Sequence, residues 1–238
     1  MFGLASRFRK LGISLDFPHI ITVICGALYL LCLALDPGAI LQPSGMMEIL
    51  SPSGRASFDA GATGGIPVGR YGRWWTVITA IYLHGNLLHI FFNMMWVRQL
   101  GPVVEELFGP FRLFVIFTVA GAVGFIASTM MGSPLTLGAS GSIFGLLAAA
   151  IVYGRRIGSD MFTRQYLQWA LIMFVFGIIM PGIDNWAHGG GFIGGYAMAW
   201  LFSRTPNDRE GLGAYVLAGV CALLTVLAFA LQFLATIG

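Results

Sequence analysis

Charge is what this sequence has least of. Only 10% of its 238 residues are charged, whereas 57% are hydrophobic, and the mean hydropathy is +0.82. So few charges cannot cover the surface of a soluble protein, and the apolar runs are long enough to cross a bilayer. The net charge of +3 is small, and the basic residues are spread among short segments, which argues against nucleic-acid binding. We therefore expect a multi-pass integral membrane protein in contact with the lipid bilayer.

Cysteine is also scarce. Cys25, Cys32 and Cys221 all lie within apolar runs and lack the spacing of a metal site, so we expect them to be small buried side chains. The sequence also shows no soluble domain and no internal repeat. We expect no metal and no other cofactor.

Long apolar stretches are abundant. All of them read as helices, because an isolated strand cannot satisfy its backbone in lipid, and the expected fold is an all-α membrane helix bundle. The seven stretches cover about 18–35, 87–104, 112–131, 141–154, 165–181, 186–203 and 212–236.

The first stretch has two interpretations. Basic residues precede it and Cys32-Leu33-Ala34 resembles a cleavage site, as in a signal peptide. The apolar run is long for a signal peptide, however, and Asp36-Pro37 follows at once. We therefore favour a retained membrane helix.

The basic residues predict the orientation in the membrane. With a cytoplasmic N-terminus, ten of the thirteen Lys and Arg residues face the cytoplasm, as the positive-inside rule requires. The starts of the fourth and sixth stretches then share the outer side, and residues 36–85 form a long outer loop. The inner set is Arg7, Arg9, Lys10, Arg98, Arg112, Arg155, Arg156, Arg164, Arg204 and Arg209, and the outer set is Arg55, Arg70 and Arg73.

Ser140 lies at the start of the short fourth stretch. Residues 141–153 span roughly 20 Å as a helix, against a hydrocarbon core of about 30 Å. The helix should therefore begin below the outer surface, beside water, with Ser140 as a candidate nucleophile. The alternative is that Ser140 only caps the helix.

His188, at the start of the sixth stretch, is the candidate base for Ser140. Small residues at intervals of four, Gly141 and Gly145 on one stretch and Ala187, Gly191 and Gly195 on the other, allow the two backbones to pack closely.

Two residues near Ser140 and His188 in the sequence also have predicted roles. Phe144, one turn after Ser140, is expected to stack on the His188 ring, or else simply to pack in the core. Asp184 is expected to cap the sixth helix rather than to complete a triad.

His89 and Asn93 share one face of the second stretch, four residues apart. Two polar side chains on one otherwise apolar face, opposite a candidate nucleophile, indicate an oxyanion site more than a simple interhelical hydrogen bond. His84 either braces the outer loop or joins the same network.

Three motifs carry a family resemblance. His84-Gly85-Asn86-Leu87-Leu88-His89 with Asn93, then Gly138-Ala139-Ser140-Gly141, then Ala187-His188 with Gly191 and Gly195, resemble the signatures of rhomboid intramembrane serine proteases. The resemblance covers about residues 15–204 and implies a six-helix core whose Ser–His dyad cleaves transmembrane proteins near the outer membrane face. It makes Ser140 the nucleophile, His188 the base, and His89 and Asn93 the oxyanion donors.

The resemblance also divides the chain. It implies a catalytic core at 18–204, and a seventh helix after an inner loop at 205–238, as in the subgroup with an extra C-terminal helix; the basic residues make 1–17 a cytoplasmic segment. We expect the C-terminus outside. No transit peptide or sorting tail is visible, which favours a bacterial plasma membrane. The fifth helix, with Gly177 and Pro181 near its outer end, is the candidate gate for substrates.

The sequence departs from the family pattern in the outer loop. Where many relatives have Trp-Arg, this chain reads Trp75-Thr76, with Arg73 upstream, so the loop is expected to be anchored differently.

Two other functions compete with proteolysis. A catalytically inactive relative would typically have lost Ser140 or His188, and a transporter would use the same polar side chains to line a path.

Overall fold

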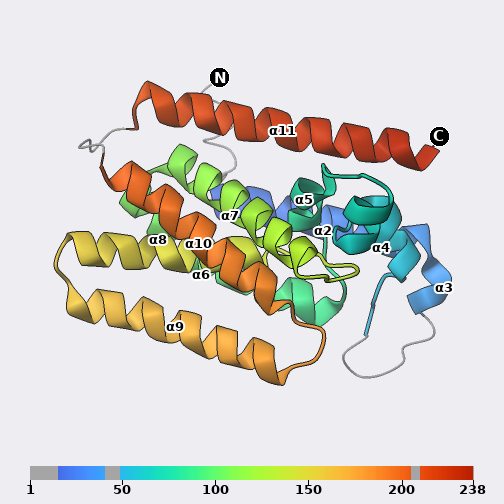
Figure 1. The fold of residues 1–238 in the computed structure, drawn as a ribbon, viewed down its shortest axis with the longest axis horizontal. Coiled ribbons are helices and arrows are strands. Elements are labelled where there is room, and N and C mark those ends of the chain that lie inside the picture. The colour runs from blue at the N-terminus through green and yellow to red at the C-terminus, as the bar shows by residue number, and fades with distance from the viewer. Residues whose placement is uncertain (1–15, 41–48, 205–209, 238) are drawn as a thin grey trace, which may run out of the picture.

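The computed structural model describes residues 16–40, 49–204 and 210–237, and within these ranges it is a helix bundle without strands (Figure 1). This confirms the all-α prediction. The long helices are α2 (Phe17–Leu35), α6 (Leu87–Phe108), α7 (Pro110–Met130), α8 (Ser140–Arg156), α9 (Asp160–Ile179), α10 (Asn185–Ser203) and α11 (Leu212–Ile237). The short ones are α3 (Pro37–Ile40), α4 (Gly54–Ala60), the π-helix η2 (Gly65–Arg70), α5 (Thr76–Thr79) and the 3₁₀ helix η3 (Ala80–Tyr82).

Some predictions fall on other parts of the chain. Most of the predicted segment 1–17 and the start of the predicted inner loop lie outside the described residues, as do Arg7, Arg9, Lys10 and Arg209. Within the described ranges, each of the seven predicted stretches corresponds to one long helix.

Side-chain caps explain where four of these helices begin. Asp16, Asn86, Ser159 and Asp184 each accept a hydrogen bond from the backbone N–H three residues further along. Such a bond satisfies one of the donors that a helix start leaves free. The sequence therefore carries local start signals for α2, α6, α9 and α10.

α8 lies at the centre of the bundle. From Gly141 to Val152 every residue is buried, and the helix packs against α6, α7, α9 and α10. It runs to Arg156, two residues beyond the predicted end, so its last turn includes Arg155 and Arg156. Even so, its 17 residues make it shorter than any other long helix.

Glycines let α10 approach α8 at backbone distance. A Cβ added to Gly191 would lie 2.1 Å from Gly141 O, and one added to Gly195 would lie 2.2 Å from Gly145 Cα. Either contact would force the helices apart, so no larger side chain fits here. The predicted close packing of these two helices is confirmed.

α9 and α11 lie at opposite edges of the bundle (Figure 1). α9 packs chiefly on α8 and α11 chiefly on α7, and both expose many apolar side chains. By length and composition, α2, α7, α9 and α11 can each cross a bilayer, and α5–η3 with α6 form a fifth candidate span bent by 89°. α2 contributes Ile21, Cys25 and Tyr29 to the core, which supports a retained helix. All three cysteines are free and buried, as expected.

Candidate functional site

Ser140 is the first residue of α8. The capping position belongs to Ala139, which makes no side-chain capping hydrogen bond, so the interpretation of Ser140 as a helix cap is wrong. The Ser140 side chain is only partly buried, whereas Ala139 and Gly141 on either side are fully covered. A hydroxyl at the first turn of a helix also lies at the positive end of the helix dipole.

His188 lies in the first turn of α10, beside the start of α8. The contact is direct, because a Cβ on Gly141 would lie 3.1 Å from Ala187 O. The Phe144 ring stacks on the imidazole with centroids 4.3 Å apart and planes inclined by 19°. The stacking expected from the sequence is therefore confirmed, and it fixes the plane of the His188 ring, which is only 5% exposed.

The Asn185 side chain contacts one nitrogen of the His188 ring. His188 Nδ1 lies 3.1 Å from Asn185 Oδ1. A carbonyl oxygen can only accept, so Nδ1 is the nitrogen that donates in this contact, and in the neutral ring Nε2 then keeps its lone pair. The His188 ring is thus set up to accept a proton at Nε2.

His89 has the opposite arrangement. The Gly85 N–H donates to His89 Nδ1 over 3.4 Å, so Nδ1 is the acceptor and Nε2 carries the hydrogen. Nε2 faces the backbone just before Ser140, because a Cβ on Gly138 would lie 2.6 Å from it. Gly138 also has φ +128°, so glycine is required there for two reasons.

Asn93 is buried one turn after His89 and is 5% exposed. One of its two amide hydrogens is used, since Nδ2 donates to His89 O over 2.8 Å. Its Oδ1 has no hydrogen-bond partner among the described residues. A buried amide with unused capacity is costly, which is expected of a side chain held for a ligand.

His84 belongs to the same cluster. Its ring is 1% exposed and meets the His89 ring edge-to-face, with centroids 5.1 Å apart. Of the two roles considered from the sequence, this geometry favours membership of the network.

Both carboxylate oxygens of Asp184 accept hydrogen bonds within the protein. Its Oδ1 accepts from the Ala187 N–H over 3.0 Å, and its Oδ2 accepts from the Ser128 hydroxyl. The predicted cap of α10 is confirmed. The side chain that contacts His188 Nδ1 is Asn185 rather than Asp184.

Asn185 was not among the site residues predicted from the sequence. It stands three residues before His188 on one helix, a spacing that brings side chains together, and this signal was available. Asp184 was the residue considered as a third member of a triad, because that member is usually acidic.

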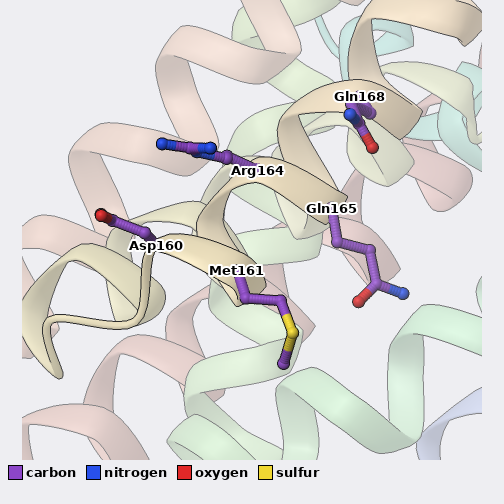
Figure 2. Close-up of a pocket in the computed structure, with 5 residues that line it drawn as sticks. All are labelled: Asp160, Met161, Arg164, Gln165 and Gln168. Carbon is purple, nitrogen blue, oxygen red and sulfur yellow. The ribbon is translucent and has the colours of Figure 1, made fainter.

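A hollow of about 540 Å³, whose lining side chains are drawn in Figure 2, shares no residue with this cluster. Its lining belongs entirely to the first half of α9, on the side of the bundle where α8 ends rather than begins. The lining residues are Asp160, Met161, Arg164, Gln165 and Gln168. It holds none of the site residues predicted from the sequence.

Comparison with known proteins identifies relatives. Residues 71–205 match the Rhomboid domain family. Rhomboid protease GluP of Bacillus subtilis is 36% identical over 132 residues, which are 54% of this chain and 26% of that protein. RHOMBOID-like protein 1 of Arabidopsis thaliana is 28% identical over 183 residues, 74% of this chain and 47% of that protein. Putative rhomboid protease YdcA of Bacillus subtilis is 28% identical over 145 residues, 58% of this chain and 72% of that protein.

The matches differ in how much they cover. The chain spans about a quarter to a half of the length of GluP and RHOMBOID-like protein 1. The family match covers more than half of this chain and stops before α11.

Proposed function

Because the chain belongs to the rhomboid family, we propose that it is an intramembrane serine endopeptidase that cleaves transmembrane proteins near the outer membrane face through a dyad of Ser140 and His188. The observation that carries the proposal is the complementary state of two imidazoles. His188 is held with Nε2 free to accept, and His89 with Nε2 ready to donate.

In the proposed reaction, Ser140 Oγ attacks the carbonyl carbon of the scissile bond while His188 Nε2 takes its proton. The Asn185 carbonyl oxygen holds the Nδ1–H of the imidazolium that forms. A serine hydroxyl is a weak nucleophile until such a base accepts its proton. The Phe144 ring keeps the imidazole plane fixed during the transfer.

The negative oxygen of the tetrahedral intermediate then needs donors. His89 Nε2–H, the second Nδ2–H of Asn93 and the Ser140 backbone N–H are the proposed set. Fixed donors in a water-poor site stabilise such an oxygen far more than donors in water do.

The intermediate collapses when His188 gives its proton to the leaving amine, which breaks the peptide bond and leaves an acyl group on Ser140. Water then attacks the ester, with His188 again taking a proton and returning it to Ser140 Oγ. Both products leave and the enzyme is restored, so the reaction consumes one water for each bond cleaved.

Two other functions have less support. A client-binding relative without activity does not need the imidazoles held in complementary states, nor both Ser140 and His188. A transporter with a central polar path is disfavoured because the polar cluster gathers at the starts of α6, α8 and α10. Substrate flux into vesicles, without peptide cleavage, would favour the transporter.

The decisive experiment is labelling of the detergent-solubilised protein with a serine-reactive fluorophosphonate. We expect labelling of the wild type and none of Ser140→Ala. Cleavage of a transmembrane substrate should be lost in Ser140→Ala and in His188→Ala, and the double variant should lose little more, because the two residues act as a unit. Substantial turnover by either single variant would rule out the dyad.

A further inference from the structure

Gln232 is a buried polar side chain near the end of α11, a mostly apolar helix at the edge of the bundle. It is 2% exposed, and its amide is fully used. Nε2 donates to Phe58 O over 3.2 Å and to Asp59 O over 2.9 Å, while Oε1 accepts from the Trp75 indole N–H over 2.9 Å. Burying an amide is favourable only when its hydrogen bonds are made, and here all partners belong to the outer loop.

Two more contacts tie the same end of α11 to the loop. Arg73 Nη2 donates to Ala235 O over 3.0 Å, and Thr236 Oγ1 lies 3.1 Å from Asp59 O as well as 2.8 Å from Gln232 O. A cation at the last carbonyls of a helix is also favoured by the helix dipole. The Arg73 guanidinium lies 4.7 Å from the centre of the Phe58 ring, so one side chain joins both elements.

The loop held in this way is joined to the backbone that precedes Ser140. Thr63 and Thr136 form an antiparallel bridge with N–H to O distances of 2.9 and 2.7 Å. The Gly65 N–H donates to Ser133 O over 2.8 Å, and the Gly138 N–H donates to Ala80 O over 2.9 Å. The Ser133 N–H donates to Ser128 O in α7, but the other backbone hydrogen bonds named here tie residues 133–138 to the outer loop.

Gly61 connects the two halves of this arrangement. It follows α4 with φ +109°, and a Cβ there would lie 3.1 Å from Gln232 Cγ and 2.5 Å from Thr79 Oγ1. Thr79 in turn donates to Gly61 O over 2.6 Å. The contacts from α11 to the segment before Ser140 are thus continuous.

We propose that Gln232 is a positioning residue: through the outer loop, α11 holds residues 133–138, and with them the Ser140 backbone amide, in the geometry of the site. The consequence for catalysis rests on the function proposed above. Gln232 itself touches no reacting atom. This assigns the seventh helix, which lies beyond the family match, a part in the active site.

The test compares Gln232→Leu with Leu231→Ala, a change at the neighbouring, 45% exposed position on the same helix. In Gln232→Leu, amide hydrogen exchange should speed up about tenfold at 63–66 and 133–138, since exchange reports local opening of such bonds. kcat on a transmembrane substrate should fall about tenfold with KM within about twofold, as expected when the transition state alone loses an aligned donor. Leu231→Ala should change neither.

Trp75→Phe is the second variant. It removes only the indole donor to Gln232 and keeps an aromatic ring, so it carries the test if Gln232→Leu fails to fold. We expect a smaller change of the same kind. Unchanged exchange at 133–138 in the folded variants would overturn the proposal, whatever happens to activity. If the wild type cleaves no substrate, the proposed protease function fails, while the exchange measurement still decides whether α11 holds this segment.

Discussion

At the scale of single residues, His89 and Asn93 provide the sharpest test of the oxyanion assignment. Removing one such donor typically lowers the rate by about 10²–10³, roughly 2.7–4 kcal/mol, with little change in substrate binding. We therefore expect His89→Ala and Asn93→Ala each to lower kcat strongly with KM nearly unchanged. Active-site titration gives kcat per folded molecule, and Gln99→Ala, an exposed change on the same helix, is the control.

A purely structural role for His89 and Asn93 predicts something else. Both variants would then melt at lower temperature, and the folded fraction that survives would cleave at the normal rate. Melting curves measured beside the titration separate the two outcomes.

Asn185 should affect catalysis through the tautomer of His188. Asn185→Leu removes the acceptor for Nδ1–H, and loss of one such bond, worth about 1.4 kcal/mol, corresponds to about tenfold in kcat. Asn185→Asp keeps an acceptor oxygen and should restore most of the rate. Steady-state kinetics of both variants, with Trp186→Phe as control, provide the measurement. A folded Asn185→Leu enzyme with full kcat would show that the contact does not orient the base.

How far single residues could be predicted depended on how local their contacts are. The Asp184 cap follows from helix-start chemistry. The Phe144 stack joins two helices, but it was expected because Phe144 lies one turn after Ser140 and small residues let α8 and α10 pack closely. The burial of Gln232 was not expected from the sequence, because its hydrogen-bond partners lie more than 150 residues earlier in the chain. The pairing of the Gly85 N–H with His89 depends on a loop conformation that no periodicity encodes.

At the scale of elements, α9 is the helix held least firmly among those around the site. Only 17% of the most apolar 18-residue stretch of α9 is buried, and the helix packs mainly against α8. Its contact with α6 includes the edge-to-face pair of Trp96 and Trp169, with centroids 5.6 Å apart. The proposed gate for a membrane-embedded substrate is therefore the space between α6 and α9.

Linking these two helices covalently should close that path. We expect a short bifunctional maleimide between Trp96→Cys and Trp169→Cys to slow cleavage of a transmembrane substrate, while a short soluble peptide is cleaved at the usual rate. Each single cysteine variant treated with the same reagent is the control. Equal rates for the embedded substrate before and after linking would argue against this gate.

The elements themselves were largely predictable, because each long helix combines an apolar run with a polar break or a cap. The structure of the outer loop was not predictable in this way. Its short helices, its π-helix and the Thr63–Thr136 bridge depend on contacts with α11 and with residues 133–138 rather than on local pattern. The displaced Arg73 illustrates this, since its partner is a carbonyl of the last helix.

At the scale of the whole molecule, the two ends of the described chain lie on opposite sides of the bundle. α2 runs from Phe17 towards the outer loop, whereas α11 ends at that loop, where Gln232 and Thr236 bind it. The basic residues are unequally divided between the sides. Arg55, Arg70 and Arg73 lie with the loop, and the helix ends opposite it carry the larger described set of Arg112, Arg155, Arg156, Arg164 and Arg204.

This asymmetry predicts the orientation in the membrane. The side richer in Arg should face the cytoplasm, so a reporter fused to the N-terminus should be active inside and one fused to the C-terminus outside. Changing Arg155 and Arg156 together to Gln removes two charges from the last turn of α8. It should weaken the preference without reversing it, since eight of the ten Lys and Arg residues predicted on the inner side remain, against three on the outer side. Paired alkaline phosphatase and green fluorescent protein fusions to each end provide the measurement. A C-terminus found inside would place Ser140 and His188 towards the cytoplasm and would contradict cleavage at the outer face, even if both residues prove essential.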